Sequence, residues 1–349
     1  MTADPTVPRR RPARGEPEAV STPGDRISEL DVLRGVALCG ILVINVYQQL
    51  VWLRGDPSAR NVLPTAVDLI FYERFMPIFA MLFGVGFGLF LERAARRTER
   101  PRLVLARRLA VLLVIGGVHQ FFHVGEALFP YALVGLVLLI PMSFLPPRAC
   151  LVVGIVLLVL LPQVQTSVGL IAGLLPFGFG LARVGVPDGL RRHPGRVAVA
   201  FAVGAVVVLA WTAAQLADVR LPVVSVFGGA LGGDLLHATA AVAGAIAYSC
   251  LVLLLLRTPL GPAMDAVFAP VGRMALTNYL AATVLFLTLG PLLGIDSLAD
   301  GPAIAGLTVG ILVVQVLWSR LWLRHFTYGP VEWGWRCLTW GRRAPLRRG

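Results

Sequence analysis

The stretch VAVAFAVGAVVVLAWTAAQLA, residues 197–217, has no charged side chain along 21 consecutive positions. A helix of about 20 apolar residues has the length needed to cross the hydrocarbon core of a bilayer. The rest of the 349-residue chain has the same character, because 57% of its residues are hydrophobic and only 14% are charged. Soluble domains carry about 25% charged residues. The sequence therefore predicts an all-α fold, a polytopic integral membrane helix bundle.

Apolar runs of similar length recur on both sides of this stretch and predict about ten membrane spans. The run at 149–161 is short for a full crossing, and the run at 66–91 is interrupted by Pro77 and by three nearby glycines. LFGVGFGLFLER (82–93) and LLPFGFGLARVG (174–185) share a spacing of small residues, which predicts close helix packing rather than a duplicated domain. The predicted spans cover residues 30–52, 66–91, 103–123, 127–145, 149–161, 166–183, 197–217, 236–256, 271–291 and 302–323.

Two arginine-rich segments flank the predicted bundle of residues 28–325. Residues 1–27 are rich in Pro and Arg without an apolar run, which predicts a disordered tail, and residues 326–349 form a basic C-terminal tail. All of the basic residues are arginines, and they gather in alternate loops, so both termini are expected on the cytoplasmic side of the inner cell membrane. No soluble segment is long enough to present a basic face to nucleic acid. The four cysteines are scattered and predict neither a disulfide framework nor a zinc site.

Polar residues at the predicted cytoplasmic ends of the spans form a first group of candidates. Ionisable groups at membrane depth are costly, and therefore mark functional sites. Ser28 and Asp31 fit an ordinary helix start, whereas Arg34 lies one turn deeper and can pair with Asp31. Guanidinium groups that converge at one depth are well shaped to hold phosphates. For Arg107 and Arg108, the alternative is that their side chains snorkel to the lipid headgroups. The candidates for this inner group are Asp31, Arg34, Arg107, Arg108, Arg273 and Asn278.

A second group lies at the predicted outer ends of the spans. His119 and His123 are four residues apart on one helix face, and Glu126 begins the following turn. Asp234 and His237 are three residues apart at the outer end of another span. A histidine held by a carboxylate is suited to act as a general base toward a hydroxyl or amine. Metal binding and ordinary interfacial polarity are the alternatives, and no metal is assigned.

Several motifs resemble the YeiB-like family of bacterial multi-pass membrane proteins. One is the opening Leu30-Asp31-Val32-Leu33-Arg34-Gly35-Val36-Ala37-Leu38, followed by Gly40-Ile41-Leu42 and Asn45. Another is Phe83-Gly84-Val85-Gly86-Phe87, and a third leads from Arg107-Arg108-Leu109 through Gly116, His119 and Glu126 to Tyr131-Ala132-Leu133. The most specific pair is GRMALTNYL (272–280) with SRLWLRHFTYGPVEWGWRCLTWG (319–341), so the resemblance spans roughly residues 26–341.

The family looks like a branch of the transmembrane acyltransferase superfamily, and its opening is similar to that of heparan-alpha-glucosaminide N-acetyltransferase. The resemblance implies that an acyl group passes from cytosolic acyl-CoA, acetyl-CoA in the first instance, to a sugar or other acceptor on the far side. The resemblance implies that the inner group binds the acyl-CoA donor, with Arg273 and Asn278 in contact with the donor. His119 is the general base, Glu126 orients it or binds the acceptor, and His123, Asp234 and His237 lie on the acceptor side.

The sequence also departs from these relatives. Residues 48–72 contain no His, where the acetyltransferase has its catalytic one, and Glu126 stands where the family more usually has Asp. A transporter of a small anionic or lipidic solute is the main alternative, because interrupted spans such as 66–91 are typical of transporters. A structural or regulatory membrane component leaves the buried Arg and His residues unexplained. The expected partners are the bilayer, acyl-CoA and a glycan or small-molecule acceptor, with a homodimer left open.

Overall fold

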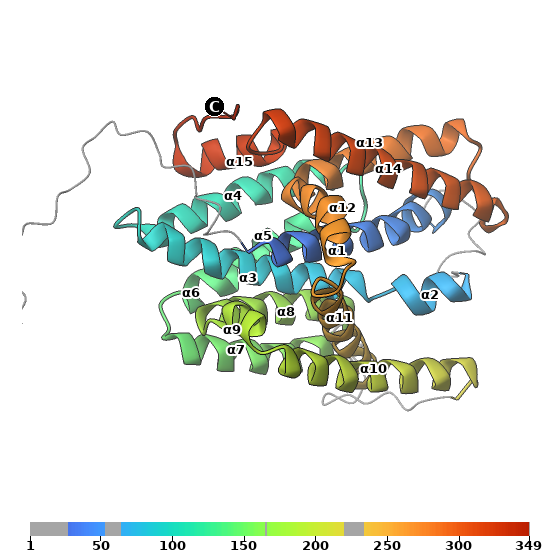
Figure 1. Cartoon of the computed structure of the whole chain (residues 1–349), viewed down its shortest axis with the longest axis horizontal. Coiled ribbons are helices and arrows are strands. Elements are labelled where there is room, and N and C mark those ends of the chain that lie inside the picture. Colours follow the sequence, from blue (N-terminus) through green and yellow to red (C-terminus); the bar gives the residue numbers. More distant parts are fainter. Residues whose placement is uncertain (1–26, 53–63, 165, 220–233, 349) are drawn as a thin grey trace, which may run out of the picture.

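The computed structural model describes residues 27–52, 64–164, 166–219 and 234–348, so the predicted tail 1–27 lies outside the described residues except for Ile27. Within these ranges the molecule consists of packed helices (Figure 1), and its β pairing is limited to an isolated bridge between Phe326 and Arg347. The predicted all-α class is confirmed. The helices are α1 (Ser28–Tyr47), α2 (Thr65–Phe71), α3 (Phe75–Ala95), α4 (Pro101–His119), α5 (Leu128–Val134), α6 (Ile140–Met142), α7 (Pro147–Leu160), α8 (Thr166–Arg183), α9 (Val186–Arg192), α10 (Pro194–Leu216), α11 (Leu235–Leu255), α12 (Gly261–Arg273), α13 (Ala275–Leu292), α14 (Gly301–His325) and α15 (Pro330–Trp340).

Six helical segments of the described chain are long and apolar enough to cross a membrane. Three shorter apolar segments lie at 128–142, 147–163 and 168–183. The helix α4 is not among the six and carries three arginines along its 19 residues. The chain is therefore a multi-pass membrane protein, while the count of about ten spans stays a prediction. The six segments are Ser28–Val51, Thr65–Ala95, Pro194–Leu216, Leu235–Leu255, Ala275–Leu292 and Leu298–His325.

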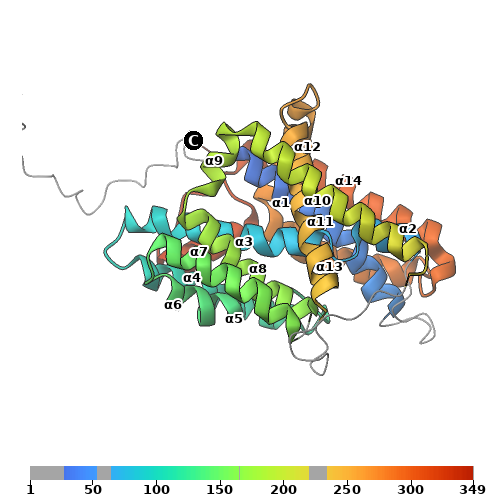
Figure 2. The same cartoon turned by 90° about the horizontal axis from the view of Figure 1, so that it is seen from below.

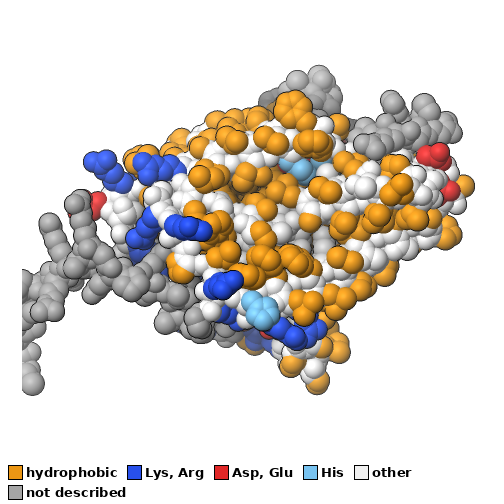
Figure 3. Space-filling view, turned by 90° about the horizontal axis from the view of Figure 1, so that it is seen from above, with side chains coloured by type: hydrophobic (Ala, Val, Ile, Leu, Met, Phe, Trp, Pro, Cys, Tyr) orange, Lys and Arg blue, Asp and Glu red, His pale blue; other side chains and the backbone are white. Residues whose placement is uncertain are grey.

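The surface matches a membrane environment. Large apolar side chains are exposed along α10 and α14, for example Val203 and Leu209 on the first and Val309 and Leu317 on the second. Figure 3 shows apolar side chains spread over the visible face, with arginines gathered in one half of it. Contiguous exposed apolar surface of this extent is unfavourable in water and favourable against lipid.

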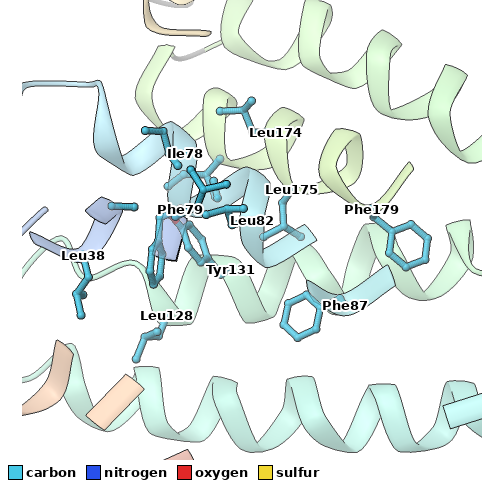
Figure 4. Packing of buried hydrophobic residues seen from close by; sticks show 14 of the residues in the cluster. Leu38, Ile78, Phe79, Leu82, Phe87, Leu128, Tyr131, Leu174, Leu175 and Phe179 are labelled. Carbon is cyan, nitrogen blue, oxygen red and sulfur yellow. The ribbon is translucent and has the colours of Figure 1, made fainter. Parts of the chain in front are cut away.

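Small residues bring α3 and α8 into close contact. Gly84 on α3 faces the backbone of α8 at Leu175, and Gly178 on α8 faces the backbone of α3 at Met81, so that a Cβ at either glycine would collide with the other helix. This contact explains the shared spacing of small residues in 82–93 and 174–185. Figure 4 shows the large side chains that fill the interior around it. In Figures 1 and 2, α7 also packs along α8, and α10 along α11.

Two predicted spans are broken at positions that the sequence did not indicate. The run 66–91 breaks between α2 and α3 at residues 72–74, where Glu73 has a positive φ of 49°, rather than at Pro77 or the glycines. Pro77 lies in the first turn of α3, where a missing N–H is tolerated. The run 271–291 breaks at Met274 between α12 and α13. Both breaks place charged side chains inside the bundle.

Candidate active site

An arginine cavity of about 300 Å³ opens where the start of α1 meets α3, α4, the α12–α13 junction and α15. Its lining includes five arginines and two carboxylates, so the site has a positive excess of three charges. The cavity brings together predicted residues from both ends of the chain. The charged lining residues are Asp31, Arg34, Arg93, Arg108, Arg273, Arg336 and Glu332.

Arg34 and Arg273 are positioned by short-range contacts. One Nη of Arg34 lies 3.2 Å from an Oδ of Asp31, an ion pair between successive turns of α1. Gly86 on α3 leaves the space that the Arg34 guanidinium occupies, because a Cβ there would lie 3.1 Å from its Nη2. Arg273, the last residue of α12, donates to the carbonyl of Thr327 at 3.4 Å. The break after α12 thus directs this guanidinium into the cavity.

Arg108 is held by aromatic rings. Its guanidinium carbon lies 3.6 Å from the centre of a Trp335 ring and 4.8 Å from that of Phe90. The indole N–H of Trp335 donates to the backbone carbonyl of Arg108 at 2.8 Å, so α15 is docked on α4. Aromatic contacts attract the charge without using the N–H donors of a guanidinium. Arg108 is therefore fixed in place and still equipped to bind an anion.

Two predicted donor residues do not line this cavity. Successive residues of a helix point about 100° apart, so Arg107 is directed away from the cavity that Arg108 lines. Arg107 is exposed, and the snorkelling alternative fits it. Asn278 is buried, and its amide donates to the Val271 carbonyl at 3.2 Å and to the Ser319 hydroxyl at 2.9 Å. It joins α13 to α12 across the break and to α14, which is a structural role.

The C-terminal segment contributes residues that sequence reasoning missed. The sequence predicts a basic tail from residue 326, but α15 in that segment places Glu332, Trp335 and Arg336 in the cavity wall. Glu332 accepts hydrogen bonds from the backbone N–H of Thr277 at 3.0 Å and from its hydroxyl at 2.5 Å. Burial raises the pKa of the Glu332 carboxyl. The motif 319–341 is the sequence signal that could have pointed to this wall.

A second polar cluster, which we call the histidine cluster, joins the end of α4 to the middle of α13. It consists of His119, His123, Glu126 and Thr283, each at most 6% exposed. His119 places Nδ1 3.4 Å from Glu126 and Nε2 3.0 Å from the hydroxyl of Thr283. His123 Nδ1 lies 3.0 Å from the same hydroxyl. The predicted approach of Glu126 to His119 is found, and Thr283 is a partner that the sequence analysis missed.

The carboxylate fixes the direction of these hydrogen bonds. Glu126 accepts the backbone N–H groups of Leu128 at 2.7 Å and Phe129 at 2.5 Å, so its oxygens act as hydrogen-bond acceptors here. His119 Nδ1 must then donate to it, so Nε2 is the acceptor and receives the proton of the Thr283 hydroxyl. Because that hydroxyl has given its one proton to His119, His123 Nδ1 donates to its oxygen.

Aromatic rings surround the histidine cluster. The ring of Tyr279 lies 5.1 Å from that of His119 and 5.9 Å from that of His123, and the ring of Phe286 lies 5.8 Å from that of His123. The Tyr279 hydroxyl accepts the backbone N–H of Ala127 at 3.3 Å, which ties the turn after α4 to α13. These rings limit the access of water to Thr283.

Asp234 and His237 lie elsewhere. Asp234 caps the start of α11 by accepting the N–H of Leu236 at 2.9 Å, and His237 pairs with Glu73 at the α2–α3 break. The rings of Trp211 and His237 form a T-shaped pair with 5.5 Å between their centres. None of the described contacts links these residues to His119, so the predicted outer group divides into two sites. The described part of the chain contains no group of three or more His, Cys, Asp or Glu side chains arranged to hold a metal ion.

A larger apolar cavity of about 740 Å³ adjoins the arginine cavity. The two cavities share Ile27, Leu30 and Leu82 in their linings. The lining of the larger cavity is mostly apolar and includes side chains of α1, α3, α8 and α11, together with the charged residues Glu29, Arg257 and Asp265. A charged pocket therefore lies beside a space suited to hydrocarbon.

The fold and these sites define a multi-pass helical membrane protein with polar clusters inside its bundle. Residues 181–342 match the family described as "Protein of unknown function (DUF418)". The chain is 30% identical over 336 residues to "Uncharacterized 39.9 kDa protein in amylase 3'region" of Bacillus acidopullulyticus, an alignment that covers 92% of this chain and 96% of that relative. The chain belongs to the YeiB-like family.

Two further relatives support the assignment. The chain is 29% identical to "Uncharacterized protein YeiB" of Escherichia coli (strain K12), with 92% of this chain and 98% of that protein covered. It is 25% identical to "Uncharacterized protein YxaH" of Bacillus subtilis (strain 168), with 93% and 96% covered. No solved structure shows a significant match to this chain. The family resemblance found in the sequence is thus confirmed, and it leaves the activity open.

Proposed function

We propose that this protein is an integral membrane acyltransferase that moves an acyl group from cytosolic acyl-CoA to a hydroxyl or amine acceptor. The observation that carries the proposal is the connection of the two polar sites by one helix. Leu276 of α13 lines the arginine cavity, and Thr283, seven residues further along, touches His119. Seven residues are two turns, so both side chains lie on one face of α13, about 10 Å apart along the axis.

The arginine cavity suits the donor end of this reaction. Coenzyme A is a polyanion with several phosphate groups, and five guanidinium groups against two carboxylates attract such a ligand. Trp335 and Tyr328 add aromatic surface to the same lining. Because arginine-rich ends of membrane proteins face the cytoplasm, this cavity would open toward cytosolic acyl-CoA. The same rule supports placing both termini inside, with the acceptor, a sugar or another envelope component, on the other side.

The histidine cluster suits the transfer step. His119 has an acceptor nitrogen toward a hydroxyl and a donor nitrogen toward a carboxylate, which is the arrangement of a general base with its positioning group. Burial strengthens such an arrangement, since water does not compete for the hydrogen bonds. Acyl transfer needs a base of this kind to take a proton from the attacking hydroxyl or amine.

The test is a transfer assay with the full-length protein in detergent or nanodiscs. Labelled acetyl-CoA is supplied, and binding, release of free CoA and label on an added glycan are measured. Saturable binding together with CoA release supports the proposal. Failure to bind acetyl-CoA under conditions in which the protein is folded contradicts it and favours transport of a small anion instead.

A pH prediction follows from Glu332. Its pKa is raised by burial, so as the pH falls through that pKa the carboxyl is protonated and the cavity loses one negative charge. Acetyl-CoA is then expected to bind more tightly at acid pH, by about fivefold, or roughly 1 kcal/mol. The measurement is the dissociation constant against pH for the wild type and for Glu332→Gln.

The glutamine variant separates this group from the titrating phosphates of the ligand. Glutamine keeps the side-chain shape and an oxygen that accepts from the Thr277 N–H, so α15 stays docked. The variant should bind tightly at all pH values and lack the increment. Identical pH profiles for the two proteins would show that Glu332 does not act on the ligand.

A further inference from the structure

We propose that Thr283 is the nucleophile that carries the acyl group, as a threonine ester, between the donor and the acceptor. This proposal rests on the acyltransferase function proposed above and assigns it a covalent intermediate. It concerns a residue that the sequence motifs left unremarked, because a threonine within an apolar run is ordinarily a hydrogen-bonded helix residue.

The environment of the Thr283 hydroxyl supports this role. Thr283 is 2% exposed, yet its oxygen lies 3.0 Å from a ring nitrogen of each of two histidines. Its own helix offers only a long contact, 3.5 Å to the carbonyl of Tyr279. By comparison, Thr308 on α14 donates to the carbonyl of Ile304 at 2.7 Å, the usual state of a buried threonine in a helix. Thr283 is thus directed toward the histidines rather than toward its own backbone.

The direction of the hydrogen bonds in the histidine cluster also supports it. With Glu126 as the acceptor, the hydrogen bonds run from Thr283 Oγ to His119 Nε2 and from His119 Nδ1 to Glu126. A hydroxyl, an imidazole and a carboxylate in this order form the arrangement that activates serine and threonine nucleophiles. The N–H of His123 meets the same oxygen and holds the hydroxyl in this orientation.

The position of Thr283 on α13 supports it as well. Thr283 lies on the face of α13 that reaches the arginine cavity at Leu276, so the donor thioester needs to extend about two helical turns from that cavity. A donor and an acceptor that approach from opposite sides of a membrane need not then be bound at the same time. Thr283 is buried beside histidines that the rings of Tyr279 and Phe286 contact, which limits hydrolysis of an ester at this position.

The chemistry balances without a further reagent. Thr283 Oγ attacks the thioester carbonyl while His119 Nε2 takes the hydroxyl proton, the C–S bond breaks, and the CoA thiolate leaves with that proton. The acceptor hydroxyl or amine then attacks the ester carbonyl and gives its proton to His119. When the C–O bond to Thr283 breaks, His119 returns the proton to the threonine oxygen.

The experiment is isotope exchange in the absence of any acceptor. Labelled free CoA and unlabelled acetyl-CoA are incubated with the full-length protein, and label in acetyl-CoA is measured alongside mass spectrometry of the protein. A covalent intermediate predicts exchange and an acetyl group on the peptide that contains Thr283. Thr283→Val, which has a similar shape and no hydroxyl, should lose both signals to background, and Thr283→Ser should keep both.

Thr308→Val is the matched control, because it removes a buried hydroxyl from another membrane helix and should leave exchange unchanged. Thermal unfolding in detergent verifies that each variant is folded. Exchange at the wild-type rate in folded Thr283→Val, or an acetyl group found on His119, overturns the proposal. Wild-type protein that transfers label to a glycan without exchange also overturns it and leaves direct acyl transfer standing. Wild-type protein that does not bind acetyl-CoA overturns the acyltransferase function itself.

Discussion

Replacement of His119 by alanine is expected to abolish acyl transfer and to leave the protein folded in the membrane. The rate of transfer should fall by about 10²- to 10⁴-fold, which is the usual contribution of a general base. The fold should survive because Glu126 keeps its two backbone donors, at Leu128 and Phe129, when the imidazole is removed. The measurement is CoA release from acetyl-CoA by purified protein, with thermal unfolding recorded on the same sample.

His193→Ala is the control for this substitution, because His193 is exposed just before α10 and away from the histidine cluster. It should transfer at the wild-type rate. Binding of acetyl-CoA to His119→Ala should stay within about twofold of the wild type, since His119 does not line the arginine cavity. A folded His119→Ala protein with normal transfer would remove His119 from the mechanism.

Substitution of Arg108 by glutamine is expected to weaken acetyl-CoA binding by roughly tenfold to a hundredfold. The estimate corresponds to about 1.5–3 kcal/mol for a hydrogen bond to a charged group. Arg107→Gln, one residue earlier on the same helix, changes the net charge of the protein by the same amount but lies outside the cavity. Equilibrium binding of labelled acetyl-CoA to both variants, at one ionic strength, is the measurement.

The comparison of neighbouring arginines separates local recognition from general charge attraction. If both variants lose affinity equally, the ligand responds to the overall field of the arginine-rich end and the cavity is not its site. If only Arg108→Gln loses affinity, the guanidinium beside Trp335 contacts the ligand. Unfolding temperatures must agree between the variants, because Arg108 also supports the docking of α15.

Much of the fold was predictable because hydropathy measures the property that a bilayer selects. The runs at 236–256 and 302–323 match α11 and α14 to within two residues at each end. The break at residues 72–74 was not predictable, since Glu73 pairs with His237, 164 positions away in the chain, and no local pattern reports such a partner. The helix α12 was also missed, because its charged and small residues are typical of a loop that precedes a membrane span.

The candidate site was predictable where charge alone identified it. Asp31, Arg34, Arg108 and Arg273 meet in one cavity, as their common depth suggested. The choice between Arg107 and Arg108 depends on the rotation of α4 about its axis, which the near-uniform apolar composition of that helix does not fix. Thr283 could be recognised only once α13 lay beside the end of α4.

The crossing of α1 and α12 determines how the arginine cavity can change shape. Gly272 lies against the backbone of α1 at Asp31, and Gly35 lies against the backbone of α12 at Phe268, so the two main chains touch without side chains between them. This wall cannot slide or separate without losing backbone contact. The facing wall is α15, which is held by side-chain contacts of Glu332 and Trp335. For a polyanion larger than the cavity, such as the proposed donor, we expect α15 to be the wall that moves, with α1 and α12 as the fixed frame.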